Sequence, residues 1–279
     1  MHGTEEKMKN FNMMKKLLAL TLGAAMLLAV MTGCGKKDTA QEPADDQQQQ
    51  QEEQQPAEPA TLLEQIKAKG KVVVGTEAQY APYEFKDLDA NFAGCDMWLA
   101  QQIADSLGVE LEVVDMAFDG IIPAVASGGQ CDVGVSGFSV DPKRAKEVDF
   151  SDTYYIDDQA IAVMQGGSIT KDNVNEALNA EGMIIAVQTG TTGADYAAEN
   201  FPNATVQGFG NSTDCFAAMQ SGQANAVITN KAVVEKMLEA YTEAEIVKSV
   251  ATGEEYAIVV AKDNPQLTAA INEAIAKLE

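Results

Sequence analysis

The sequence is poor in histidine and arginine. Its 279 residues include one histidine, His2, and one arginine, Arg144, and the other basic residues are lysines. Removal of an N-terminal leader would leave no histidine at all. Because imidazole is the usual general base at neutral pH and a common zinc ligand, this scarcity argues against histidine-based catalysis and His-ligated zinc. It favours a binding protein over an enzyme.

Positive charge is also scarce overall. The chain has 19 Lys and Arg against 42 Asp and Glu, a formal net charge of −23. Such a balance argues against nucleic acid or an anionic membrane surface as a partner. A hydrophobic content of 46% is ordinary for a globular protein, and the length fits one large domain or two small ones.

The four cysteines suggest neither a disulfide framework nor a metal site. They are Cys34, Cys95, Cys131 and Cys215, and no Cys-x-x-Cys pair occurs. If Cys34 is set apart, an odd number remains, and the spacing assigns no disulfide. We therefore expect free, buried thiols, and we expect no metal and no cofactor.

The N-terminal region has the pattern of a secretion signal. Two lysines precede an apolar stretch, short for a membrane span, that ends at Thr32-Gly33-Cys34. Cys34 at this point resembles the lipobox cysteine of bacterial lipoproteins, which implies a signal peptide over 1–33 and a lipidated, for example palmitoylated, Cys34. The alternative is a signal anchor that stays uncut. Met8, Met13 and Met14 are alternative translation starts.

Residues 34–60 are expected to form a disordered, acidic, Gln-rich tether. After Cys34 they contain no aromatic side chain and no aliphatic side chain larger than alanine. Such a segment cannot bury enough apolar area to offset the entropy of ordering. The remaining part, 61–279, has 13 Lys and Arg against 33 Asp and Glu and is the candidate folded region.

Strand and helix patterns alternate through the folded region. A capping box at 61–64 predicts a helix that ends at Gly70, and 71–75 predicts a buried strand. Further patterns follow, with helices over 97–107, near 119–127, from about 193 and at the C-terminus, and strands over 109–116, 131–137, 183–188 and 227–230. This alternation predicts an α/β protein with mainly parallel sheets.

An internal similarity suggests two lobes. Residues 126–133 (ASGGQCDV) resemble residues 220–227 (QSGQANAV), each being a helix end, a glycine turn and a strand that runs on to Gly137 or Asn230. Two similar α/β lobes are the simplest interpretation, with chance similarity as the alternative.

Arg144 is the strongest candidate for a binding residue. It follows Asp141-Pro142, a typical helix start, which predicts a position in the first helical turn. The helix dipole disfavours a cation there, so an incoming anion would explain the arginine, and its fork fits a carboxylate. The alternative is an internal ion pair with Glu147 or Asp149.

Two further segments are candidate parts of the same site. Residues 188–193 (QTGTTG) stand between a strand and a helix, where free N–H groups bind anions, but they lack the lysine of a nucleotide-binding loop. Glu77, Tyr80 and Tyr83 follow the carboxyl end of a strand, where α/β sheets bind ligands. The alternative is that the tyrosines only pack against their own loop.

Several blocks together resemble the family 3 extracellular solute-binding proteins of polar amino-acid ABC importers. They cover about residues 62–278 and are GTEAQYAPYEF, FDGIIPAVASG, SGFSVDPKRAKEVDFSDTYY, VQTGTTGADYA and AIVVAKDNPQL. The resemblance implies a two-lobed type II periplasmic-binding-protein-like fold, a Venus flytrap with two hinge strands. It implies one lobe from 61–158 and 259–279, which contains both chain ends, and a second lobe from 159–258.

The resemblance also implies roles for individual residues. Arg144 would bind the α-carboxylate of an amino acid, with Ser139 and with Thr192 at its helix N-terminus. The carbonyl of Gly137 would accept from the α-ammonium, and Phe118 and Tyr80 would enclose the ligand. Glu77 would face the ligand side chain or the amine.

Asn230 departs from the family pattern, because an aspartate commonly stands there and pairs with the α-ammonium. A neutral amide loses a charge-assisted hydrogen bond, in general about 1.5–3 kcal/mol. Three alternatives follow: Glu77 provides the charge, affinity is weak, or the ligand is not a standard α-amino acid. Cys95 and Trp98 also interrupt the residue pattern with which the first long helix usually begins in this family. We expect the Trp98 side chain to serve in packing.

The resemblance implies a lipid-anchored, extracytoplasmic receptor that delivers a polar amino acid to an ABC importer permease. Glu77 and Tyr80 favour a basic or amide amino acid. We expect a monomer that touches the membrane through its anchor only. The alternative is an enzyme like the cyclohexadienyl-acid dehydratases, with Glu77 as general acid, and a sensor module is a third, weaker possibility.

Overall fold

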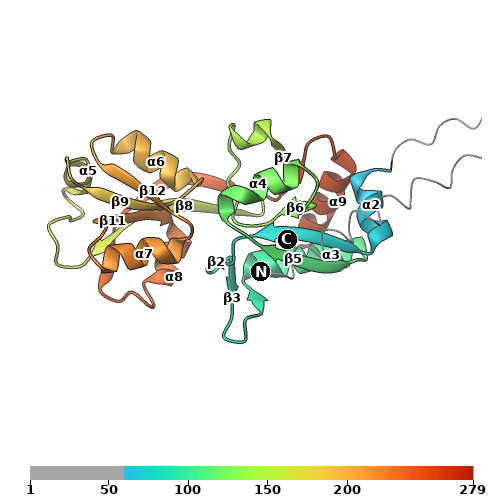
Figure 1. The fold of residues 1–279 in the computed structure, drawn as a ribbon, viewed down its shortest axis with the longest axis horizontal. Helices are drawn as coiled ribbons and strands as arrows, with labels where there is room; N and C mark the ends of the chain where they lie inside the picture. Colours follow the sequence, from blue (N-terminus) through green and yellow to red (C-terminus); the bar gives the residue numbers. More distant parts are fainter. Residues whose placement is uncertain (1–59, 279) are drawn as a thin grey trace, which may run out of the picture. The chain divides into compact units, whose positions relative to one another are not determined.

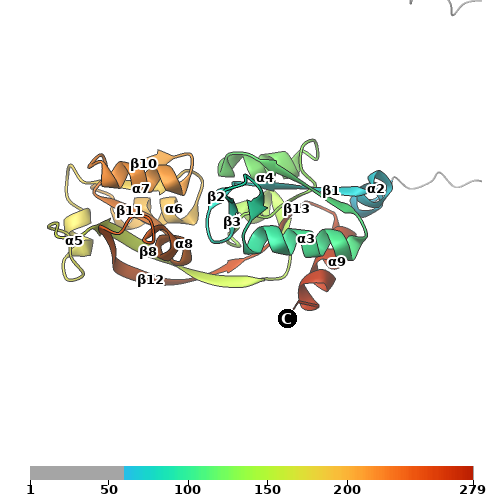
Figure 2. The ribbon, with the colours of Figure 1, turned by 90° about the horizontal axis from the view of Figure 1, so that it is seen from below.

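The computed structural model describes residues 60–278, which belong to one compact unit. Figures 1 and 2 show this unit from two directions. The predicted signal peptide, Cys34 and all but the last residue of the predicted tether lie outside the described residues. Among those described, no helix combines the length and apolar character needed to cross a bilayer.

The first lobe is built on a five-stranded sheet. Its strand order is β5 (Glu110–Asp115), β1 (Lys71–Thr76), β6 (Val133–Gly134), β13 (Val259–Ala261) and β7 (Val148–Phe150). Its helices are α2 (Leu62–Lys69), α3 (Cys95–Leu107), α4 (Phe118–Ala126) and α9 (Pro265–Ala276).

Alternating side chains of β1 bury both faces of this sheet. Val72 and Val74 pack in one cluster with α2, α3 and α9. On the other face Gly75 lies directly under Ile121 of α4, where a Cβ would come within 3.0 Å of that side chain. The core of the first lobe therefore has helices on both sides, as an α/β sheet requires.

The second lobe repeats this plan. Its strand order is β10 (Thr205–Phe209), β9 (Ile184–Gln188), β11 (Ala226–Asn230), β8 (Tyr155–Met164) and β12 (Ala244–Tyr256). Its helices are α5 (Val174–Leu178), α6 (Thr192–Asn200), α7 (Ser212–Gln220) and α8 (Lys231–Met237). The helices α5 and α6 share one buried cluster with the sheet, and α7 and α8 share another.

Two long antiparallel strands, β8 and β12, connect the lobes. They pair from Met164 and Ala244 in the second sheet to Tyr155 and Tyr256 near the first, and Figures 1 and 2 show both running between the two sheets. The predicted two-lobed fold with two hinge strands is confirmed. The predicted boundary at 158/159 falls inside β8, and that at 258/259 lies between β12 and β13.

A small third sheet carries part of the site. Its order is β2 (Gln79–Tyr80), β3 (Glu84–Lys86) and β4 (Phe92–Ala93). It follows the carboxyl end of β1 and lies beside the gap between the lobes (Figure 1). It thereby brings Tyr80 and Glu84 to the region where β1 ends.

Most predicted elements are present, with a few differences. The capping box of α2 forms as predicted, with Thr61 and Glu64 bonding each other's backbone. The main sheets are mixed rather than mainly parallel, because β13, β8 and β12 pair antiparallel with their neighbours. The strand predicted over 131–137 shortens to β6, whereas its counterpart extends to Asn230 as β11.

The helix predicted after Asp141-Pro142 is wrong. Only one 3₁₀ turn, η1 (Arg144–Lys146), forms there. The carboxylate of Asp141 does accept from the N–H groups of Lys143 and Arg144, at 2.7 and 3.1 Å, but the chain enters β7 directly afterwards. The helix-dipole argument for an anion at Arg144 therefore loses its basis, because three residues make almost no macrodipole.

Two expectations about packing are also wrong. Trp98 does not pack in the core, since 56% of its surface is exposed. Cys95 is exposed as well, whereas Cys131 and Cys215 are buried, and all three thiols are free in the described part of the chain. Both exposed residues stand at the start of α3, on its solvent side, so they interrupt no core contact.

Candidate functional site

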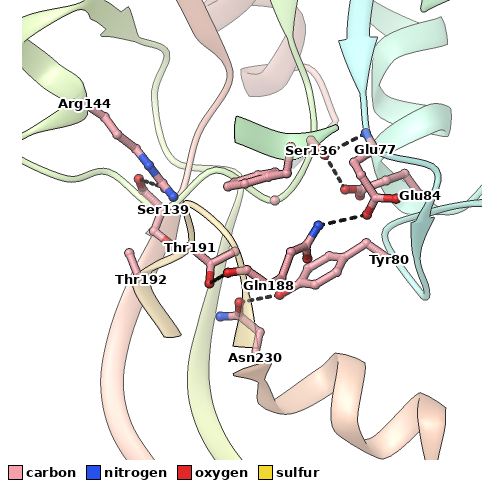
Figure 3. Close-up of a pocket in the computed structure, with 12 residues that line it drawn as sticks. Glu77, Tyr80, Glu84, Ser136, Ser139, Arg144, Gln188, Thr191, Thr192 and Asn230 are labelled. Atoms are coloured by element: carbon pink, nitrogen blue, oxygen red, sulfur yellow. Dashed lines mark hydrogen bonds between the residues drawn. The ribbon is translucent and has the colours of Figure 1, made fainter. Parts of the chain in front are cut away.

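A cavity lies where the first lobe, the small sheet and the second lobe meet (Figure 3). The first lobe and the small sheet line it with Glu77, Tyr80, Glu84, Phe118, Ser136, Gly137, Ser139 and Arg144. The second lobe lines it with Gln188, Thr191, Thr192 and Asn230. Glu77 follows β1, Gln188 ends β9 and Asn230 ends β11, so strand ends form the site, as in other α/β proteins.

Arg144 occupies one end of the cavity without an ion pair among residues 60–278. Its Nη1 and Nη2 donate to the backbone carbonyls of Ser139 and Gly190 at 2.9 and 3.0 Å. The guanidinium lies 5.3 Å from the ring centre of Phe118, and burial lowers the pKa of Arg144. The alternative ion pair with Glu147 or Asp149 does not form.

Two buried carboxyl groups lie at the other end. Glu77 is 4% exposed and accepts from Gln188 Nε2 at 3.1 Å. Glu84 Oε1 accepts from Ser136 Oγ at 2.6 Å, while its Oε2 is buried without a hydrogen-bond partner in the described part of the chain. Burial raises the pKa of Glu77 to about 7, so about half of it is ionised at neutral pH.

A third carboxyl group lies behind this end. Asp96 accepts from the backbone N–H of Gly137 at 2.8 Å and from the hydroxyl of Tyr154 at 2.9 Å. Burial raises the pKa of Asp96 to about 6, and burial together with the Asp96 charge raises the pKa of Glu84 well above its usual range. Both effects favour the neutral form of Glu84, whereas Asp96 is mostly ionised at neutral pH.

Tyr80 joins the two lobes near the middle of the cavity. Its hydroxyl donates to Asn230 Oδ1 at 2.6 Å and lies 3.1 Å from Thr229 Oγ1. Its ring stacks on Tyr83, with centroids 6.0 Å apart. Gly137 adopts a positive φ of 54° beside the Tyr80 and Tyr256 rings, a conformation that favours glycine.

The hydroxyls of Ser139 and Thr192 meet at a carboxylate that the sequence did not single out. Both donate to Glu254 Oε2, at 2.5 and 2.8 Å. Thr192 begins α6, and the preceding Thr191 caps that helix by accepting from the N–H of Ala194. Glu254 belongs to the hinge strand β12, so the hinge takes part in the site.

The structure thus brings all eight predicted binding residues to one cavity, and their roles toward a ligand stay predictions. Sequence reasoning missed Glu84, Ser136 and Glu254. Glu84 lies in the same short segment after β1 as Glu77 and Tyr80, and this closeness in sequence could have identified it. Within residues 60–278 no group of three or more His, Cys, Asp or Glu side chains is arranged to hold a metal ion.

Comparison with known proteins decides the family. The bacterial extracellular solute-binding proteins, family 3, match residues 72–279. The chain belongs to this family. It is accordingly a substrate-binding protein of the polar amino-acid type, and the family's members act outside the cytoplasm.

Named relatives and solved structures agree with this assignment. The arginine-binding extracellular protein ArtP of Bacillus subtilis is 32% identical over 64% of this chain and 57% of its own length. The glutamine-binding protein GlnH of the same organism is 28% identical over 95% of this chain and 93% of its own. An arginine-bound mutant of ArgBP from T. maritima superposes with a TM-score of 0.72 at 33% identity, over 78% of this chain and all of that one.

One structural neighbour is related to an enzyme. The ancestral amino-acid-binding protein AncCDT-1, described as a precursor of cyclohexadienyl dehydratase, has a TM-score of 0.71 at 34% identity. It covers 78% of this chain and 93% of that one. The fold is therefore shared by binding proteins and by a precursor of an enzyme.

Proposed function

We propose that the protein captures a polar amino acid with a nitrogen-bearing side chain, basic or amide, and delivers it to the permease of an ABC importer. One observation carries the proposal. A half-buried arginine that has no carboxylate partner among residues 60–278 stands at one end of the cavity, and two buried carboxyl groups stand at the other. This polarity fits a ligand with a carboxylate at one end and a side-chain nitrogen at the other.

The Arg144 end is suited to the α-carboxylate. A partly desolvated guanidinium gains a strong bidentate hydrogen bond when a carboxylate binds it, and Phe118 and Phe138 limit its movement. Free N–H groups at the start of α6 add donors next to it. Among the described residues the guanidinium donates only to the backbone carbonyls of Ser139 and Gly190, and a ligand carboxylate that displaced them would add charge pairing.

The Glu77 end is suited to the side chain. Glu77 and Glu84 together offer one ionisable carboxylate and one unpartnered oxygen, both buried. A guanidinium, ammonium or amide group donates to such acceptors, whereas a third carboxylate there would be repelled. The relatives described as arginine-binding and glutamine-binding support this ligand class. Aliphatic parts of the ligand would lie against the Tyr80 and Phe118 rings.

Binding requires the lobes to separate and close again. The cavity measures about 10 Å³, about enough for one water molecule and far too little for an amino acid. Contacts between the lobes hold it shut, including Tyr80 to Asn230 and Gln188 to Glu77. A ligand that replaces these contacts shifts the equilibrium toward a liganded closed form. The permease would recognise that form.

A dehydratase activity is the second candidate function. It is favoured by the likeness to AncCDT-1 and by Glu77, whose pKa of about 7 suits a general acid. It is less favoured because the relatives described above are binding proteins and because the described residues contain no histidine. Turnover of a cyclohexadienyl acid would establish it.

The lipid anchor belongs to the same proposal. Cys34, after an apolar stretch that ends in small residues, would carry the acyl chains, and residues 34–60 would tether the lobes to the outer side of the membrane. The protein would then act as a monomer held near its permease. Apart from Ala60, these residues lie outside the described part of the structure.

Thermal melting with each standard amino acid tests the proposal. A ligand at a thousandfold excess over its Kd stabilises by about 4 kcal/mol, which at this size raises Tm by about 8–16 °C. We expect one or two basic or amide amino acids to give this shift in the wild type and none to give it in Arg144→Ala. The Arg144→Ala protein alone should melt as a folded protein.

Two melting results would contradict the proposal. If no amino acid raises Tm in the wild type, the proposed function is wrong, and ring acids are the next ligands to try. If acidic amino acids alone raise Tm, the assignment of Glu77 and Glu84 to the ligand side chain is wrong.

A further inference from the structure

Glu254 is the carboxylate that lies next to the Arg144 end of the cavity. Its Oε2 accepts from Ser139 Oγ at 2.5 Å, from Thr192 Oγ1 at 2.8 Å and from Asn230 Nδ2 at 3.4 Å. All three donors line the cavity. Glu254 is partly buried, so its charge acts in a region that water screens less than the surface.

The local structure of the hinge directs this side chain inward. Val250 of β12 pairs with Gln159 of β8, and Glu254 pairs with Asp157, so three residues of β12 lie opposite one residue of β8. Gly253 takes a positive φ of 58° within this bulge and donates its N–H to Asp158 Oδ1 at 3.0 Å. Bulges of this kind re-aim a side chain, and they are frequent near active sites.

The opposite hinge strand fixes the carboxylate. Gln159 Nε2 donates to Glu254 Oε1 at 2.7 Å, while the Gln159 side chain is fully buried. Each oxygen of Glu254 therefore has a partner from a different part of the molecule. A carboxylate held by neutral donors on several sides keeps its negative charge available to a cation.

The geometry of an α-amino acid decides which ligand group this charge would meet. The α-ammonium and the α-carboxylate share one carbon, so the group that receives the ammonium must lie close to the group that binds the carboxylate. Figure 3 shows Ser139 and Thr192 on the Arg144 side and Glu77 and Glu84 on the far side. Asn230 is neutral, so it brings no charge to the ammonium.

We propose that Glu254 is a ligand-binding residue that receives the α-ammonium of the bound amino acid, with Ser139 and Thr192 between it and the Arg144 end. The inference rests on the proposed function, because it presupposes an amino-acid ligand. It leaves Glu77 and Glu84 free for the ligand side chain. It also ties the ligand to the hinge strand that connects the lobes.

Glu254→Gln tests this role, with Glu255→Gln as the matched control. Both variants remove one charge from the same strand, but Glu255 is exposed, and its one side-chain hydrogen bond within residues 60–278 is a 3.4 Å contact with Thr153. The probes are L-arginine and L-glutamine and their analogues without the α-amino group, 5-guanidinopentanoate and 5-amino-5-oxopentanoate. Titration calorimetry gives the Kd of each, with competition at millimolar concentration for the weaker analogues.

We expect Glu254→Gln to weaken binding of the amino acid by about tenfold or more, since a charge-assisted hydrogen bond is lost. Glu255→Gln should change it by less than about twofold. The desamino analogue should bind wild type and Glu254→Gln equally, a pattern that misfolding would not produce.

Two results would overturn the proposal. If Glu254→Gln binds the amino acid as tightly as the wild type or more tightly, Glu254 only occupies donors that the ligand carboxylate would otherwise use. If amino acid and desamino analogue lose affinity equally, the loss has a structural origin. Failure of the wild type to bind any amino acid contradicts the proposed function instead, so the two failures are distinguishable.

Discussion

The two lobes contribute different chemistry to the cavity. The first lobe and its small sheet supply the ionisable carboxyl groups, the guanidinium and both aromatic rings that line it, whereas the second lobe supplies the amide and hydroxyl side chains of Gln188, Thr191, Thr192 and Asn230. Charge recognition is thus concentrated in the first lobe and, at Glu254, in the hinge strand β12. The other lobe closes the site with neutral hydrogen bonds, which are individually weaker.

This division has a physical advantage. The charged groups of the first lobe are partly desolvated in the closed form, as the raised pKa of Glu77 and the lowered pKa of Arg144 indicate. A ligand that pairs with them offsets the cost of desolvating these charges when the lobes close. Neutral contacts in the second lobe can then form and break as the lobes move, without leaving a buried charge unpaired.

Loss of the Glu77 charge should have a large effect on selectivity between ligand side chains. We expect Glu77→Gln to weaken binding of L-arginine by about 2 kcal/mol, about 30-fold, because a charge-assisted bond becomes neutral. Binding of L-glutamine should change less, since an amide also bonds a neutral acceptor. Calorimetric titration of both ligands measures the difference, and equal losses would contradict the assignment of Glu77 to the side chain.

The Glu77→Gln variant should also remove a pH dependence of the affinity for L-arginine. The pKa of Glu77 is about 7 without ligand because of burial. A cationic side chain favours the ionised form and lowers that pKa, so binding below pH 7 requires a proton to leave. The affinity for L-arginine should therefore rise by up to about tenfold between pH 6 and pH 8. In Glu77→Gln this rise should vanish, and its persistence would assign it to another group.

Loss of a second-lobe contact should have a smaller effect. Gln188 donates to Glu77 across the lobes and accepts from Ser212 Oγ at 3.2 Å. Gln188→Ala should weaken binding by about 1 kcal/mol, about fivefold, and raise the pH midpoint, since its hydrogen bond lowers the pKa of Glu77. Gln223→Ala, at an exposed turn of the same lobe, is the control and should leave both values unchanged.

The fold was largely predictable from the sequence, and the reasons are local. The capping box at Thr61, the glycine stops at Gly70 and Gly108, and the short apolar runs each fix an element without reference to the rest of the chain. Antiparallel pairing of the hinge strands was not predictable from such signals. It depends on contacts between residues that lie far apart in sequence, such as Gln159 and Val250.

The site was predictable where residues stand next to a strand end. Arg144 was singled out on a helix that does not form, but because it is the sequence's one arginine it still drew attention to a residue that lines the cavity. Glu254 carried no signal, because its place in the site depends on a bulge and on bonds to Ser139 and Gln159, 115 and 95 residues away. Long-range geometry of this kind leaves no local pattern.

Pairing of Arg144 with the ligand carboxylate is the central claim. A thermodynamic cycle that removes the Arg144 side chain from the protein and the carboxylate from the ligand tests it most directly. The amino acid that gives the largest thermal shift and its decarboxylated amine are titrated into wild type and Arg144→Ala, by calorimetry. Lys143→Ala is the control, since its 2.7 Å ion pair with Asp195 is largely exposed and should matter little.

The account predicts that the wild type prefers the amino acid to the amine by about 100-fold or more, and that Arg144→Ala loses most of this preference. Lys143→Ala should keep it. If Arg144→Ala still prefers the amino acid to the amine as strongly as the wild type does, another group binds the carboxylate and the central claim is wrong.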